Sequence, residues 1–155
     1  MEEHVAERMI IRGTPEDCYA VLTAFEAYPD WAADIKAVTV DTRDDEGRAE
    51  QVTFRAAAFG RSTSYTLLYD YRGAPKTLSW VQVAGDLTRR LDGSYELSPS
   101  GDGSTEIEYR LVVDLKVPLP GFVKRRAEGR IMGTALRELK AYVEGSGARQ
   151  TATDS

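Results

Sequence analysis

A length of 155 residues fits one domain with a single hydrophobic core. The net charge of −5 excludes generic nucleic-acid binding, because a phosphate backbone requires a positive protein face. Cys18 and His4 are the only cysteine and histidine, so an intrachain disulfide is excluded and a His/Cys zinc or haem site nearly so. We expect no metal and no cofactor.

Both ends of the chain are polar. The N-terminal MEEHVAER is acidic, unlike a signal or transit peptide, and no apolar run approaches the roughly 20 residues of a membrane span. These features predict a cytoplasmic protein without a membrane span. Residues 145–155, GSGARQTATDS, contain no apolar anchor and are predicted to be a disordered tail. The single domain is therefore expected to cover residues 1–144.

The first expected elements are a strand at 5–13 and a helix at 14–25. VAERMIIRG alternates apolar and polar residues, which is typical of a half-buried strand. In TPEDCYAVLTAF, Thr14 is a suitable N-cap and Pro15 occupies the first helical position. Cys18 falls on the apolar face of this helix, which predicts a core residue and not a nucleophile. A break at EAYP precedes a second short helix, expected around 30–34.

From residue 35 onward the hydrophobic period changes to two, which indicates strands. Short turns rich in glycine, proline and aspartate join them, so they are expected to form an antiparallel meander with one apolar face. The expected strands are IKAVTVDTR (35–43), EQVTFRAAAF (50–59), STSYTLLYDYR (62–72), TLSWVQV (77–83), RRLDGSYEL (89–97) and TEIEYRLVVDL (105–115).

The last expected element is a long amphipathic helix within 117–145 that covers the apolar face of the sheet. Its apolar arc contains Ile131, Met132, Ala135, Leu136, Leu139, Tyr142 and Val143. Gly129, Gly133 and Ala135 are expected to face the sheet. Small side chains there would leave volume unfilled, and an empty void costs roughly 24 cal/mol per Å³. A ligand would occupy such a cavity, unless Trp80, Phe54 and the tyrosines fill the space.

The order of these elements resembles the helix-grip fold of the START/Bet v 1-like (SRPBCC) superfamily, and is similar to its bacterial polyketide cyclase/dehydrase and lipid transport branch. The resemblance covers nearly all of residues 5–143 and is carried by TPEDCYAVL, YPDW, LSW, LDGSYELSPSGDGSTEIEYRL and VPLPGFVKRRAEG. It implies an α+β fold in which a curved antiparallel sheet of about seven strands wraps around the long C-terminal helix. Two short helices follow the first strand.

The resemblance also implies an internal cavity that binds an apolar small molecule. Its expected lining is Trp31, Phe54, Tyr65, Leu67, Tyr69, Trp80, Gln82, Tyr109, Leu111, Ile131, Met132 and Ala135. Trp31 would close one end of the cavity together with Tyr28 and Pro29, or would be plain core. The tyrosines and Gln82 could orient a polar group of the ligand, or could be ordinary core residues with satisfied hydrogen bonds.

Charged residues near the start of the long helix suggest two further roles. Glu128 projects from the apolar arc, where a carboxylate is costly unless paired but suits acid/base chemistry. The alternative is that this end of the helix lies in water. Lys124 and Arg125 could bind an anionic head group or an acidic carrier protein at the cavity mouth, or could form a solvated face.

Three functions follow from this interpretation. The first is a carrier or sensor of a lipid, polyketide or quinone. The second is a cofactor-free polyketide aromatase/cyclase or dehydratase with Glu128 as its catalytic residue. The third is a protein-binding module similar to chaperone activators. The sequence names neither the ligand nor the oligomeric state.

Overall fold

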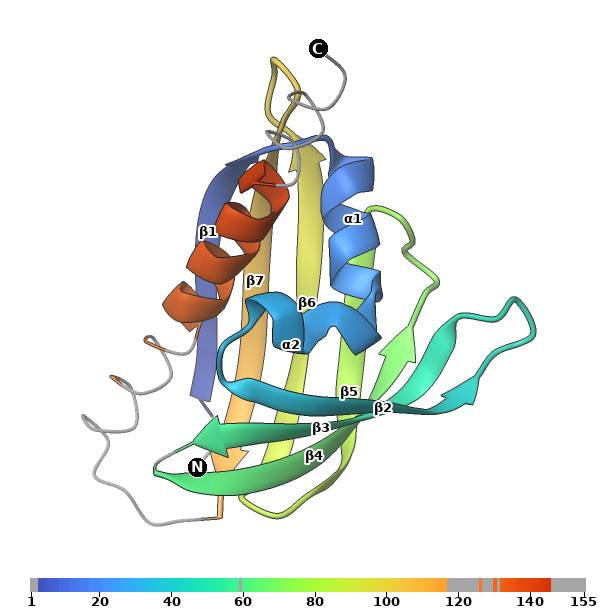
Figure 1. Ribbon diagram of the computed structural model, residues 1–155, viewed down its shortest axis with the longest axis vertical. Helices are drawn as coiled ribbons and strands as arrows, with labels where there is room; N and C mark the ends of the chain where they lie inside the picture. The colour runs from blue at the N-terminus through green and yellow to red at the C-terminus, as the bar shows by residue number, and fades with distance from the viewer. Residues whose placement is uncertain (1–2, 59, 117–125, 127–129, 131, 146–155) are drawn as a thin grey trace.

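The computed structural model describes residues 3–58, 60–116, 126, 130 and 132–145. Seven strands form one open, curved antiparallel sheet of order β1-β7-β6-β5-β4-β3-β2, with the helices on its inner side (Figure 1). This confirms the expected α+β helix-grip fold. The strands are β1 (Glu3–Arg12), β2 (Ile35–Arg43), β3 (Ala49–Ala58), β4 (Arg61–Asp70), β5 (Thr77–Gly85), β6 (Thr88–Pro99) and β7 (Ser104–Leu115).

Three short helical segments carry the chain from β1 at one edge of the sheet to β2 at the other: α1 (Pro15–Thr23), the 3-10 segment η1 (Phe25–Ala27) and α2 (Tyr28–Trp31). The expected cap is present, because the Thr14 hydroxyl accepts a hydrogen bond of 3.1 Å from the Asp17 amide. Cys18 is fully buried, as predicted. The second helix was expected around 30–34 but ends at Trp31, since Ala32 adopts an extended conformation.

The C-terminal helix, residues 132–145, packs on the inner side of the sheet near β1 and β7 (Figure 1). Its C-terminal part is tied to β1 by side chains. Lys140 Nζ donates to the Ile10 carbonyl at 3.1 Å, and Glu144 accepts from the Arg12 amide at 3.0 Å. Met132, Leu136, Leu139 and Val143 are buried against the sheet.

The expected stripe of small residues on this helix needs a correction. A Cβ atom on Gly133 would lie 3.1 Å from Nη1 of Arg137, whose side chain is exposed, so Gly133 lies on the outer side of the helix. The expectation that Gly133 faces the sheet is wrong. Ala135 does pack against the core, and Gly129 lies outside the described residues.

β5 and β6 separate part-way along their length. They pair from Thr77↔Glu96 to Trp80↔Gly93. Beyond this point β5 stays paired with β4, and β6 stays paired with β7. Gly93 permits the close approach of the Trp80 ring, because a Cβ there would lie 2.6 Å from both Trp80 Cζ2 and the Arg110 carbonyl oxygen. The indole N–H of Trp80 then donates to the Leu91 carbonyl at 3.1 Å, which partly closes the gap.

Candidate ligand-binding site

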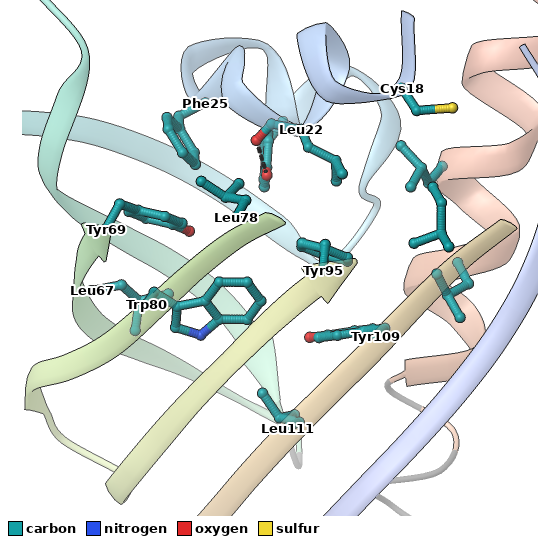
Figure 2. Close-up of a cluster of buried hydrophobic side chains, with 14 of the residues drawn as sticks. Cys18, Leu22, Phe25, Leu67, Tyr69, Leu78, Trp80, Tyr95, Tyr109 and Leu111 are labelled. Carbon is teal, nitrogen blue, oxygen red and sulfur yellow. Dashed lines mark hydrogen bonds between the residues drawn. The ribbon is translucent and has the colours of Figure 1, made fainter. Parts of the chain in front are cut away.

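Aromatic rings form a continuous layer between the sheet and the helices (Figure 2). Ring centroids lie 4.4 Å apart for Phe25 and Tyr69, 5.8 Å for Tyr69 and Trp80, and 6.1 Å for Trp80 and Tyr109. Tyr95 stacks on Tyr109 at 4.6 Å. These separations are typical of favourable aromatic pairs, so the layer is a packed band that runs from η1 to β7.

Most of the expected lining residues meet in this one core. Those that are buried are Phe54, Leu67, Tyr69, Trp80, Tyr109, Leu111 and Met132. Trp31, Tyr65 and Ala135 are half-buried and pack against it. Ile131 lies outside the described residues, as do Glu128, Lys124 and Arg125. Whether these residues bind a ligand stays a prediction.

Two phenol groups inside the layer lack hydrogen-bond partners among the described residues. Tyr28 donates to the Leu22 carbonyl at 2.6 Å, and Tyr95 donates to Tyr109. The hydroxyls of Tyr65 and Tyr69 have no such partner in this part of the chain. An unpaired buried polar group is costly, so a bound molecule would gain most at the hydroxyl of buried Tyr69 and less at that of half-buried Tyr65.

Burial keeps these phenols protonated. Desolvation raises the pKa of Tyr69 well above its usual value and raises that of Tyr65 as well. It raises the pKa of Tyr109 to about 12, against the opposing effect of the hydrogen bond from Tyr95. At neutral pH the layer therefore presents O–H donors and no phenolate base.

Among the described residues, charged side chains keep away from this interior. The polar side chains buried in the described ranges are Thr63 and Thr105, which donate to Asp86 and to the Gly13 carbonyl. The described residues also contain no group of three or more His, Cys, Asp or Glu side chains that could hold a metal ion. Acid/base chemistry in this part of the molecule would rest on the tyrosines.

Gln82 has a structural partner that its sequence position did not reveal. Its amide Nε2 donates to the Thr88 carbonyl at 2.9 Å, and its Oε1 accepts from the Thr88 hydroxyl. Its backbone amide donates to Asp92 at 2.8 Å. These bonds bridge the gap between β5 and β6 and engage both ends of the Gln82 amide within the protein; a role of Gln82 in ligand binding stays a prediction.

The short-helix corner is only partly interior. Tyr28 is buried, whereas Trp31 is half-buried and Pro29 is exposed. The Trp31 ring lies 4.9 Å from that of Tyr28 and 6.2 Å from that of Tyr142 on the C-terminal helix. Trp31 therefore links α2 to the C-terminal helix over the aromatic layer, with Tyr28 beneath it.

Two pockets open on the described surface. The corner pocket, about 470 Å³, is formed by residues of 19–27, 40–49 and Tyr71, between α1, η1 and the β2–β3 hairpin. The outer pocket, about 760 Å³, lies on the outer face of the sheet and is formed by residues of 44–50, 68–72 and 79–81. Neither is lined by the C-terminal helix, so a cavity between helix and sheet stays a prediction.

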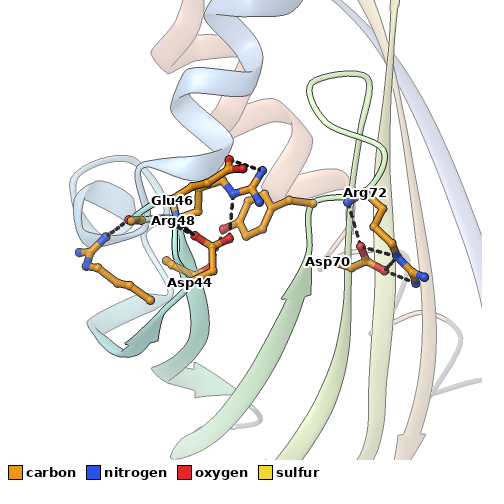
Figure 3. Close-up of polar contacts among 9 residues, drawn as sticks. Asp44, Glu46, Arg48, Asp70 and Arg72 are labelled. Atoms are coloured by element: carbon orange, nitrogen blue, oxygen red, sulfur yellow. Dashed lines mark hydrogen bonds and ion pairs between the residues drawn. The ribbon is translucent and has the colours of Figure 1, made fainter.

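Ion pairs surround both pockets (Figure 3). At the corner pocket Arg48 binds Asp44 at 2.8 Å and Glu46 at 3.3 Å. At the outer pocket the hydrogen bonds from Arg72 lower the pKa of Asp70 to about 2. Arg48 and Arg72 thus pair with carboxylates a few residues away in the sequence, whereas Arg43 at the corner pocket pairs with the distant Glu26.

The family model for "Polyketide cyclase / dehydrase and lipid transport" matches residues 2–144. The chain belongs to this family. The START-like resemblance of the sequence is thereby confirmed. A search of curated protein sequences finds no match. In the described ranges, the helices are too short or too polar to cross a membrane.

Solved structures share the fold of this family member. A START superfamily protein from Mycobacterium smegmatis is 24% identical with a TM-score of 0.87, over 92% of this chain and 97% of that one. The Zhui aromatase/cyclase from Streptomyces sp. R1128 is 11% identical with a TM-score of 0.81, over 93% and 94%. The di-domain ARO/CYC BexL from the BE-7585A biosynthetic pathway is 16% identical with a TM-score of 0.71, over 92% of this chain and 46% of that one.

Proposed function

We propose that this protein binds an apolar small molecule, a lipid, polyketide or quinone, in its interior and acts as a carrier or sensor. The observation that carries the proposal is the buried aromatic layer in which the hydroxyls of Tyr65 and Tyr69 lack partners among the described residues. A buried donor left unpaired costs about 1–3 kcal/mol. A ligand oxygen that accepts from these hydroxyls would remove that cost.

The chemistry of the layer favours some ligands over others. Its rings offer flat apolar surface, and its raised phenol pKa values leave donors only. A ligand with an apolar body and acceptor oxygens, such as the carbonyls of a polyketide or quinone, complements both features. A pure hydrocarbon would leave the hydroxyls unsatisfied. Native mass spectrometry of the purified protein, searching for a co-purified molecule of this kind, tests the proposal directly.

Ala135→Trp is expected to abolish binding of an apolar fluorescent dye while the fold persists. Ala135 is half-buried against the core, so an indole there would fill the space proposed for the ligand. Ala141→Trp is the matched control, because Ala141 lies exposed on the same helix and its replacement should leave dye binding unchanged. Circular dichroism checks the fold of both variants. Undiminished dye binding by Ala135→Trp would count against the internal site.

The second candidate function is a cofactor-free aromatase/cyclase or dehydratase. It is favoured by the structural likeness to an aromatase/cyclase and to a di-domain ARO/CYC protein. We propose Glu128 as its acid/base residue, and the protonated phenols of the layer as hydrogen-bond donors to ketone oxygens. An acidic carrier protein that meets Lys124 and Arg125 would deliver the chain in this case.

Glu128→Gln separates the two candidates. If the protein is a cyclase, turnover of a poly-β-ketone substrate should fall by roughly 10²–10⁴-fold, because general acid/base help is lost. If it is a carrier, ligand affinity should change by no more than about 1–3 kcal/mol. Arg130→Gln, at an exposed position of the helix, is the control for nonspecific effects. Absence of cyclisation by the unmodified protein would remove the catalytic candidate and leave the carrier.

A further inference from the structure

Phe25 separates the corner pocket from the aromatic layer. Phe25 is one of the residues that line the pocket, yet it is only 2% exposed, and its ring packs against Tyr69 at 4.4 Å and Tyr28 at 5.5 Å. Figure 2 shows Phe25 at the margin of the layer, beside Tyr69. Phe25 therefore lies between the corner pocket and the proposed ligand site.

The segment that carries Phe25 is short. η1 is a single 3-10 turn that connects α1 to α2. Its amide–carbonyl contacts are few, such as the Ala27 amide donating to the Ala24 carbonyl at 3.1 Å. A rotation of η1 would move the Phe25 ring away from Tyr69 and Phe54 without breaking the hydrogen bonds between strands.

One ion pair connects η1 to the opposite wall of the pocket. Glu26 accepts from Arg43 Nη2 at 2.9 Å, and Arg43 Nη1 also donates to the Gly47 carbonyl at 3.1 Å. Both side chains of the Glu26–Arg43 pair are more than half exposed, at 70% and 51%. Exposed pairs of this kind are weak, so the contact can open on a thermal timescale.

The pocket chemistry selects uncharged molecules. Tyr19 and Tyr71 supply ring surface, and the Tyr71 ring lies 4.8 Å from the Arg48 guanidinium carbon. The lining arginines, Arg43 and Arg48, are both neutralised by carboxylates. A free anion would have to displace these partners, whereas a flat neutral molecule can lie on the rings. A volume of about 470 Å³ is large enough for a drug-sized molecule.

We propose that the corner pocket is the entrance through which a neutral apolar ligand reaches the aromatic layer, with Phe25 as its gate and the Glu26–Arg43 pair as its latch. The inference rests on the proposed function, since an entrance requires an interior site. The ligand would first lie against Tyr19 and Tyr71, and then pass Phe25 when η1 rotates outward. An entrance alters rates of binding and release and leaves the equilibrium affinity alone.

Stopped-flow uptake and release of an apolar fluorescent dye tests the entrance. Glu26→Gln removes the latch, and both rates should rise by roughly 1.5- to 5-fold, the change in population that a surface ion pair typically provides. Ala24→Trp places an indole at an exposed position of the pocket wall, and both rates should fall by roughly tenfold or more. The dissociation constant should stay the same in both variants.

Arg72→Gln is the matched control, because it breaks the exposed Asp70–Arg72 pair at the outer pocket. It should leave both rates unchanged. Unaltered rates in Glu26→Gln and Ala24→Trp, with normal dye affinity, would overturn the entrance while the proposed function stands. An altered affinity with an unchanged association rate would also overturn it. Failure of the unmodified protein to take up dye would overturn both. If Ala24→Trp does not fold, Arg43→Gln replaces it and should match Glu26→Gln.

Discussion

Replacing Trp80 by alanine is expected to lower the free energy of unfolding by about 3–5 kcal/mol, the range for a large buried aromatic side chain. Trp80 is 6% exposed and is the ring that contacts Tyr69, Tyr95 and Tyr109. Its loss would open a cavity in the middle of the layer and remove the N–H bond to the Leu91 carbonyl at the β5–β6 gap. Urea unfolding, followed by circular dichroism, measures the change.

Two further variants identify the cause. Trp80→Phe keeps a ring in the layer but loses the indole N–H. It should lower the free energy of unfolding by less than Trp80→Ala does, and this loss reports mainly on the hydrogen bond across the gap. Trp31→Ala is the comparison at a half-buried tryptophan, which contacts Tyr28 and Tyr142 at the edge of the layer. Its cost should be clearly smaller than that of Trp80→Ala. Equal costs at Trp31 and Trp80 would show that the layer is not the centre of stability.

The fold follows from signals that are local in the sequence. Segments such as TEIEYRLVVDL are recognised as strands because apolar and polar residues alternate, so that one face is apolar and the other polar. Thr14 and Pro15 mark the start of α1. Short turns between consecutive strands leave an antiparallel meander as the simplest arrangement. The crossover from β1 to the far edge of the sheet was not predicted, because periodicity does not say which strands are neighbours.

The site was less predictable, because its partners are distant in the sequence. The alternation of β5 places Gln82 on the inward face, where a ligand residue is expected. Only the structure shows that β5 separates from β6 there and that the Gln82 side-chain amide donates to Thr88. The corner pocket joins Tyr19, Arg48 and Tyr71, which come together only when the β2–β3 hairpin curves toward α1. Tyr19 lies outside the apolar arc of its helix. An aromatic residue there is a weak sign of a pocket on that side of the helix, and the sequence alone does not identify the pocket.

The aromatic layer that carries the proposed function also fixes how the protein should respond to alkali. Five tyrosines of the layer, Tyr28, Tyr65, Tyr69, Tyr95 and Tyr109, have their pKa raised above the ordinary value of 10.0, with burial as the largest cause. An unfolded chain would ionise these phenols near pH 10. Above that pH the folded protein retains phenol protons that the unfolded chain loses. The contribution of these phenols to the free energy of unfolding is therefore fully present below about pH 10 and is lost above it.

Stability should accordingly collapse as pH rises from about 10 toward the folded-state pKa values. For Tyr109, whose pKa is raised to about 12, the loss by that pH is on the order of 2–3 kcal/mol. The losses at several such groups add up to a large part of the roughly 5–15 kcal/mol free energy of unfolding of a typical domain. Cooperative alkaline unfolding is therefore expected. Phenolate absorbance and circular dichroism, recorded on the same samples, should change in the same pH interval.

Tyr109→Phe supplies the quantitative check. It removes one titrating group and nearly preserves the ring, so above pH 10 the slope of unfolding free energy against pH should become shallower by about 1.4 kcal/mol per pH unit. Tyr142→Phe is the control on the C-terminal helix, where the ring stacks on Trp31 outside the layer. If phenolate absorbance from the layer appeared near pH 10 while circular dichroism remained native, the tyrosines would be open to water. The interior would then be a solvated cleft, and the buried donors proposed to hold the ligand would not exist.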